Sequence, residues 1–278
     1  MLTRSILYMM ISAACFAVIN SIIRHVDHLP TFELVFFRSI GTVACCWIVF
    51  AARGIDPLGH QRWLLFLRAI VGFTSMTLFY RALQLMPMAS AVSMRYLSPF
   101  FAAAMAIFFL GERMRRLQWL FFCTAFLGVL LLKGFDQRIT PVGLLIVLSS
   151  AIISGMVYVV IRRIGDRDHP VVVVHYFLFL SAIVSGVICC FVWETPVGYQ
   201  WPMLLSIGFF GFLAQLYMTK ALQAAETNLV VPFKYAEVIF TLLAGWMVFG
   251  EGQSIVAIMA MSLIVISLLG NVWAKRRL

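Results

Sequence analysis

The chain contains ten runs of apolar residues, each about 20 residues long, and this feature restricts its fold more than any other. A helix needs about 20 apolar residues to cross the roughly 30 Å hydrocarbon core of a bilayer. Only 12% of the 278 residues are charged and 63% are hydrophobic, which leaves too few polar side chains to cover a soluble fold. We therefore predict an all-α membrane protein with ten transmembrane helices, at about residues 5–23, 33–52, 63–85, 88–110, 117–134, 141–161, 171–193, 202–222, 227–249 and 254–273.

Prolines mark most of the short links between these runs, at Pro30, Pro57, Pro87, Pro141 and Pro170. A proline lacks the backbone N–H that a helix interior needs, so it favours a helix start or a turn. The first apolar run is followed by nine similar ones. We expect it to remain as a transmembrane helix and not to be removed as a signal peptide.

The basic residues indicate how the chain is oriented in its membrane. With the N-terminus placed inside, the inner segments hold 13 of the 21 Lys and Arg residues and the outer segments hold four. Cytoplasmic loops carry the excess of Lys and Arg in membrane proteins. We predict a multi-pass protein of the plasma membrane, the bacterial inner membrane, with both termini cytoplasmic. The net charge of +10 is then explained by the loops, and we expect the lipid bilayer and no nucleic acid as a partner.

An internal repeat divides the chain into two halves. A shift of 139 positions aligns residues 81–112 with 220–251 without a gap, giving eight identities in 32 positions. The aligned polar positions include Arg95-Tyr96 with Lys234-Tyr235 and Gly111-Glu112 with Gly250-Glu251. Because each half would hold five helices, an odd number, the second half would insert upside down. We predict two inverted five-helix repeats, residues 1–139 and 140–278, a plan that recurs in secondary transporters.

The segments RALQLMPMASAVSMRYLSPFFAAAMAIFFLGER (81–113) and KALQAAETNLVVPFKYAEVIFTLLAGWMVFGEG (220–252) resemble the EamA-type transporters of the drug/metabolite transporter superfamily. The sequence FFRS at 36–39 also resembles the second helix of these proteins. The resemblance implies ten helices in two repeats and the movement of amino acids, other metabolites or drugs, often outward. Relatives import S-adenosylmethionine or riboflavin, or exchange nucleotide-sugars or phosphorylated sugars.

Charged residues inside the apolar runs are candidates for the mechanism, because a charge in hydrocarbon is costly unless it faces a cavity or a partner. Arg95 and Lys234 lie at matching depths in the two halves, and each precedes a tyrosine, Tyr96 and Tyr235. These residues can form the ends of a substrate site or gate, or they can pair with carboxylates and hold the bundle together. Glu237 follows Lys234 by three residues, which favours an ion pair between them and leaves a proton carrier as the alternative.

Other polar residues complete the predicted site. Arg38 is deep in its run and is a cavity candidate, whereas Arg68 lies near a helix end, where snorkelling of its side chain explains it. The remaining candidates for the cavity wall are Asn20, Tyr80, Tyr158 and Gln215. All six cysteines lie within apolar runs, and their spacing suggests neither a disulfide framework nor a metal site. We also expect no cofactor.

The inverted repeat and the resemblance to EamA-type transporters favour a secondary transporter that works by alternating access, not an enzyme, and the resemblance implies export. The excess of positive charge within the apolar runs favours a small amino acid, zwitterionic or anionic metabolite as the substrate. Uptake or exchange of a cofactor-like metabolite, such as S-adenosylmethionine or riboflavin, is the first alternative. A lipid-modifying membrane enzyme or a lipid flippase is the alternative from another class, although no cluster of acid, base or metal-binding groups supports an enzyme. We expect a monomer or a homodimer.

Overall fold

The computed structural model describes residues 2–98, 101, 104–105, 116–135, 138–224, 233–234, 236–250, 252 and 254–276. This described part of the chain is helical and contains no strand. Its ten helices are α1 (Leu2–His25), α2 (Thr31–Arg53), α3 (Arg62–Leu85), α4 (Met88–Arg95), α6 (Arg116–Phe135), α7 (Pro141–Ile164), α8 (Pro170–Val192), α9 (Gln200–Ala224), α11 (Ala236–Phe249) and α12 (Ile255–Arg276).

Six of these helices are long and apolar enough to cross a membrane, namely α1, α2, α3, α7, α8 and α9. The helices α11 and α12 contain shorter apolar stretches, at Ala236–Phe249 and Ile255–Ser267. The fourth predicted run differs from its expected range, because α4 ends at Arg95 and a turn follows at Tyr96 and Leu97. The Gly-Glu signature at Gly111-Glu112 lies outside the described residues, as does Glu251.

Four of the five predicted proline breaks coincide with helix starts, and the fifth, Pro57, lies in a turn between α2 and α3. Pro30 and Pro87 are the N-caps of α2 and α4. Pro141 and Pro170 are the first residues of α7 and α8, the position where a missing N–H costs nothing. Thr140 completes the start of α7, because its hydroxyl accepts a hydrogen bond from the backbone N–H of Gly143 at 3.0 Å.

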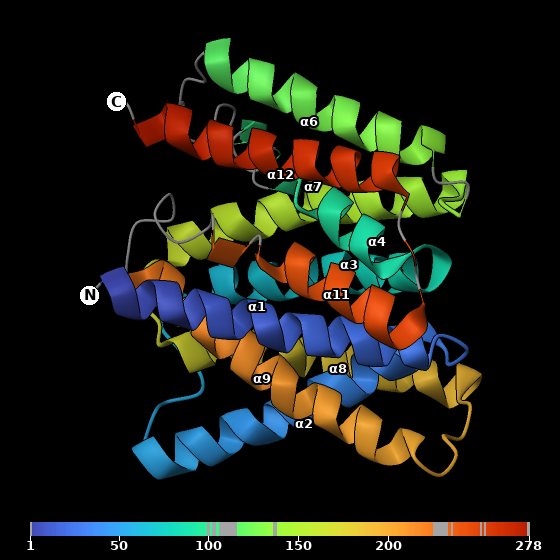
Figure 1. Ribbon diagram of the computed structural model, residues 1–278. Helices are drawn as coiled ribbons and strands as arrows, with labels where there is room; N and C mark the ends of the chain where they lie inside the picture. Colours follow the sequence, from blue (N-terminus) through green and yellow to red (C-terminus); the bar gives the residue numbers. More distant parts are fainter. Residues whose placement is uncertain are drawn as a thin grey trace.

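Two kinds of helix contact occur twice in the bundle, with the two halves of the chain in swapped roles. The helix α1 packs on α9 as α3 packs on α7, and α2 packs on α9 as α3 packs on α8. The helices α6 and α12 pack on each other and form one edge of the bundle (Figure 1). The N-terminal end of α1 and the C-terminal end of α12 lie at the same end of the bundle (Figure 1).

Two close contacts between single residues show the same swap of roles between the halves. A Cβ added at Gly72 would lie 2.8 Å from the ring of Phe177, and a Cβ added at Gly211 would lie 3.2 Å from Cγ of Arg38. Gly72 and Gly211 are 139 positions apart, and so are Arg38 and Phe177. The helices α2 and α9 also meet directly, because a Cβ at Gly41 would lie 2.8 Å from Cα of Gly208.

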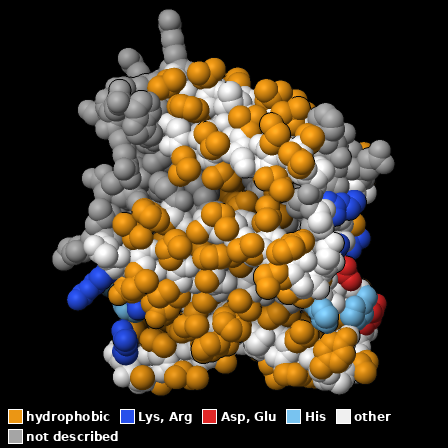
Figure 2. Space-filling view, viewed as in Figure 1, with side chains coloured by type: hydrophobic (Ala, Val, Ile, Leu, Met, Phe, Trp, Pro, Cys, Tyr) orange, Lys and Arg blue, Asp and Glu red, His pale blue; other side chains and the backbone are white. Residues whose placement is uncertain are grey.

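The outer surface is largely apolar. Large side chains such as Ile48, Phe191, Leu205 and Met247 are more than half exposed to the surroundings of the bundle. Figure 2 shows hydrophobic side chains across most of one face, with Lys, Arg and His gathered toward its margins. An exposed apolar surface of this extent is characteristic of contact with lipid. Together with the apolar helices, it makes the chain a multi-pass membrane protein.

Candidate functional site

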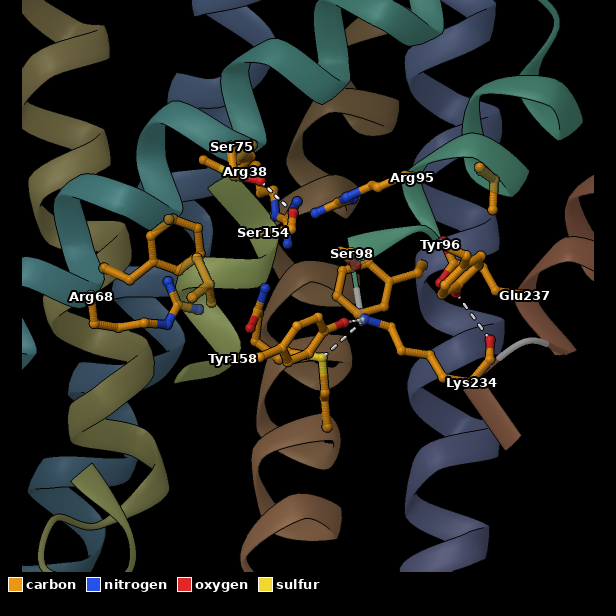
Figure 3. A pocket seen from close by; sticks show the side chains of 18 residues that line it. Arg38, Arg68, Ser75, Arg95, Tyr96, Ser98, Ser154, Tyr158, Lys234 and Glu237 are labelled. Atoms are coloured by element: carbon orange, nitrogen blue, oxygen red, sulfur yellow. Dashed lines mark hydrogen bonds between the residues drawn. The ribbon is translucent and has the colours of Figure 1, made fainter. Parts of the chain in front are cut away.

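A cavity lies in the centre of the helix bundle, where side chains of both halves meet (Figure 3). Its volume is about 60 Å³, which is room for about four water molecules. The residues that line it are Phe16, Arg38, Arg68, Gly72, Ser75, Met76, Val92, Arg95, Tyr96, Ser98, Ser154, Val157, Tyr158, Phe177, Gln215, Met218, Lys234 and Glu237. Only one carboxylate, Glu237, faces four basic side chains among these residues.

The four basic side chains come from different parts of the fold. Arg38 is on α2, Arg68 is on α3, Arg95 is the last residue of α4, and Lys234 shortly precedes α11. Arg38 and Arg68 are each only 3% exposed. Burying several like charges together is unfavourable unless an anion or strong hydrogen bonds compensate them. The cavity is therefore suited to bind a negatively charged group.

Lys234 extends into a partly aromatic environment. Its Nζ donates a hydrogen bond to the hydroxyl of Tyr158 at 3.1 Å and lies 3.4 Å from Sδ of Met218. The same nitrogen is 5.4 Å from the ring centre of Phe16 and 5.9 Å from that of Tyr96. Contacts of this kind stabilise an ammonium without neutralising it, so its positive charge remains in the cavity.

Glu237 is held by two neutral groups. Its Oε1 accepts a hydrogen bond from Nδ2 of Asn20 at 2.9 Å, and its Oε2 accepts one from the hydroxyl of Tyr96 at 2.5 Å. Among the described residues no ion pair joins Glu237 to Lys234. The ion pair that the three-residue spacing predicted is not formed, because Asn20 and Tyr96 bind the carboxylate while Lys234 extends to Tyr158.

Arg38 is held at one end of its guanidinium. Its Nη1 donates a hydrogen bond to the hydroxyl of Tyr80 at 2.5 Å, and its Cζ lies 5.6 Å from the ring centre of Phe16. Its Nε and Nη2 are buried and have no hydrogen-bond partner within the described part of the chain. Tyr80 thus fixes the position of Arg38 and leaves two donors free.

Arg68 and Arg95 both stack on phenylalanine rings. Cζ of Arg68 lies 4.4 Å from the ring centre of Phe177, and Cζ of Arg95 lies 4.0 Å from that of Phe79. Within the described part of the chain, Nε and Nη1 of Arg68 are also buried without a hydrogen-bond partner. Stacking uses the face of a guanidinium and leaves its N–H edge available to a ligand.

Most of the predicted site residues meet at this cavity. Seven line it: Arg38, Arg95, Tyr96, Tyr158, Gln215, Lys234 and Glu237. Asn20 and Tyr80 lie behind its wall and hold Glu237 and Arg38. Tyr235 lies outside the described residues. Their roles in binding a substrate stay predictions.

Arg68 is the site residue that the sequence reasoning missed. Snorkelling to the membrane surface is wrong for this side chain, because Arg68 is 3% exposed and lines the cavity. Its spacing held a usable signal. Gly72 follows Arg68 by four residues, and Ser75 follows Gly72 by three. This spacing places a small residue and a hydroxyl on the same helix face as the arginine. All three line the cavity.

A bundle of apolar helices around a buried, charged cavity is an arrangement that membrane transporters use, and comparison with known proteins gives this class. The sequence profile of the EamA-like transporter family matches residues 3–133 and, a second time, residues 141–273. The chain therefore belongs to the EamA-like transporter family and is a small-molecule transporter.

Relatives along most of the chain are named as transporters. A pseudopaline exporter of Pseudomonas aeruginosa is 27% identical over 96% of this chain and 95% of its own length. An S-adenosylmethionine uptake transporter of Rickettsia felis is 26% identical over 80% of this chain and 76% of its own length. Human solute carrier family 35 member G1 is 28% identical over 85% of this chain and 70% of its own length.

The fold also has a counterpart among solved structures. One crystal structure of a protein matches with a TM-score of 0.73 at 22% sequence identity, covering 99% of this chain and 98% of that chain. At that identity the likeness concerns the fold alone.

Proposed function

We propose that this chain is a secondary transporter that moves a small anionic or zwitterionic metabolite by alternating access, in the direction of export. The observation that carries the proposal is the charge of the cavity: four basic side chains and one carboxylate line it. A carboxylate or phosphate on the substrate would compensate the excess positive charge. The cavity between the described walls measures only about 60 Å³, so binding a metabolite would require movement of the surrounding helices.

Two inverted repeats, residues 1–139 and 140–278, form the second part of this proposal. The exchangeable helix pairs support it, and so do the glycine contacts of Gly72 and Gly211, which are 139 positions apart. The hydrogen bond of Asn20 to Glu237 has a counterpart in that of Tyr158 with Ser98. Tyr158 lies 138 positions after Asn20, and Glu237 lies 139 positions after Ser98. In such a carrier, the two halves exchange conformations and expose the same site to opposite sides.

The proposed orientation places both termini in the cytoplasm of a bacterial inner membrane. The support is the distribution of Lys and Arg, with 13 in the inner segments and four in the outer ones. Export is preferred because the relative named as an exporter aligns over 96% of this chain. Uptake is the second candidate, because another relative is named as an uptake transporter. Transport by inside-out and right-side-out vesicles distinguishes the two directions.

The test of transport is counterflow in proteoliposomes with a panel of amino acids, dicarboxylates, phosphorylated metabolites and S-adenosylmethionine. We expect saturable counterflow of at least one anionic or zwitterionic compound, and a loss of at least tenfold in the Arg95→Ala and Lys234→Ala variants. Arg53→Ala, which changes an exposed arginine at the end of α2, is the matched control and should transport normally. Normal transport by both folded cavity variants would refute the assigned role of the cavity.

A further inference from the structure

Arg38 and Arg68 present four buried hydrogen-bond donors that the described protein does not use. These are Nε and Nη2 of Arg38 and Nε and Nη1 of Arg68. Leaving a buried donor without a hydrogen-bond partner is unfavourable, and more so when the group is charged. Four such donors together at a cavity indicate that another group satisfies them when the protein functions.

The two guanidiniums are held in place by side chains that leave those donors free. The hydroxyl of Tyr80 binds Nη1 of Arg38, and the ring of Phe177 supports the face of Arg68. Gly72 and Gly211 make this arrangement possible, because a Cβ at Gly211 would lie 3.3 Å from Nε of Arg38 and a Cβ at Gly72 would overlap Nη1 of Arg68. A glycine at each position thus provides the space that the guanidiniums occupy.

The carboxylate of the cavity does not compensate these two arginines. Both oxygens of Glu237 accept hydrogen bonds from other residues, Asn20 and Tyr96. In Figure 3, Ser154 lies beside Arg38, Arg68 lies on the opposite side of the cavity from Lys234 and Glu237, and Arg95 points toward Arg38. The same cavity therefore contains two guanidiniums with unused donors, Arg38 and Arg68, and a separate group formed by Lys234 and the hydrogen-bonded Glu237.

We propose that Arg38 and Arg68 form an oxyanion subsite that binds a carboxylate or phosphate group of the transported molecule through their free N–H edges. This inference rests on the proposed transport function and deepens it, because it requires the substrate to carry an oxyanion at one end. A planar guanidinium binds two oxygens of such a group at once, and two guanidiniums can enclose it from both sides. The part with Lys234 and Glu237 then contacts the rest of the molecule.

The test is the thermal stability of the purified full chain in detergent, with added succinate, inorganic phosphate or acetate and with chloride as the control at equal ionic strength. A ligand that binds only the folded protein raises the melting temperature in a saturable way. We expect a saturable rise with succinate or phosphate and none with chloride. The ranking of phosphate against succinate tells which oxyanion the subsite prefers.

In the variants Arg38→Gln and Arg68→Gln, we expect the apparent affinity for the stabilising anion to fall at least tenfold. Arg68→Lys, which keeps the charge and loses the planar fork, should retain part of it and covers the case in which a glutamine variant fails to fold. Arg53→Gln is the control and should keep the full effect. The subsite is refuted if no anion raises the melting temperature of the native protein in a saturable way. It is also refuted if the folded Arg38→Gln and Arg68→Gln variants show the same saturable rise as the native protein.

Failure of the subsite can be told apart from failure of the transport proposal. Counterflow that depends on Arg95 and Lys234, combined with anion stabilisation that is indifferent to Arg38 and Arg68, refutes the subsite alone. A folded protein that transports no compound of the panel refutes the transport proposal, whatever its response to anions.

Discussion

The contact between Gly41 and Gly208 gives a sharp test of how the two halves pack. A Cβ added at Gly208 would lie 2.6 Å from Cα and 3.0 Å from the carbonyl carbon of Gly41. Carbon atoms in contact are normally about 3.5–4.0 Å apart. Gly208→Ala would therefore increase the distance between α2 and α9 by about 1 Å. That shift also lengthens the 2.9 Å hydrogen bond from the hydroxyl of Thr42 to the carbonyl of Gly208 beyond a useful distance.

The expected cost follows from three contributions. Overpacking costs about 1–3 kcal/mol, the lost hydrogen bond about 0.5–1.5 kcal/mol, and the better helix propensity of alanine returns about 1 kcal/mol. We therefore expect Gly208→Ala to lower the free energy of unfolding by about 2 kcal/mol. By analogy with soluble chains of similar length, this corresponds to a melting temperature about 4–8 °C lower.

Thermal unfolding in detergent, followed by tryptophan fluorescence, measures this effect, because Trp47 and Trp201 lie on the two helices concerned. Gly252→Ala is the matched control, since a Cβ there meets nothing within 4 Å. The double variant with Gly41→Ala should cost less than the sum of the single variants, because the first methyl group already separates the helices. Equal melting temperatures for Gly208→Ala and Gly252→Ala would refute the close approach of α2 and α9.

Three further predictions concern other contacts. Asn20→Ala removes a donor from Oε1 of Glu237 and should lower counterflow at least tenfold, whereas Asn20→Asp should lower it further by repulsion between two carboxylates. Asp168→Ala removes the acceptor of two backbone N–H groups before α3 and should cost about 2 kcal/mol in thermal unfolding, while the exposed Asp166→Ala should cost nothing measurable. Burial and nearby basic side chains lower the pKa of His169 in the folded chain. The neutral imidazole therefore contributes its full stabilisation above the unfolded pKa of about 6.5, and this stabilisation is lost as the pH falls below that value. In melting curves between pH 8 and 5, His169→Gln should therefore lose less stability on acidification than the native chain, and an identical pH profile would contradict this assignment.

Much of the architecture was readable from the sequence because a bilayer imposes simple rules. Apolar runs of about 20 residues predicted helices that the structure contains, and the prolines at 30, 87, 141 and 170 predicted where four of them begin. The internal repeat singled out Arg95 and Lys234, and both line the cavity. These features depend on local composition and spacing, which a single sequence contains.

The partners of the buried charges were decided by the tertiary structure. Spacing along one helix predicted that Glu237 pairs with Lys234, but Asn20 of α1 and Tyr96 after α4 bind the carboxylate instead. The same holds for Arg68, whose position near a helix end indicated an exposed side chain, although α3 directs it into the cavity against Phe177 of α8. A sequence specifies which face of a helix a charge occupies, but only the packing of distant helices determines what that face meets, and in a low-dielectric interior this determines where each charge is stabilised.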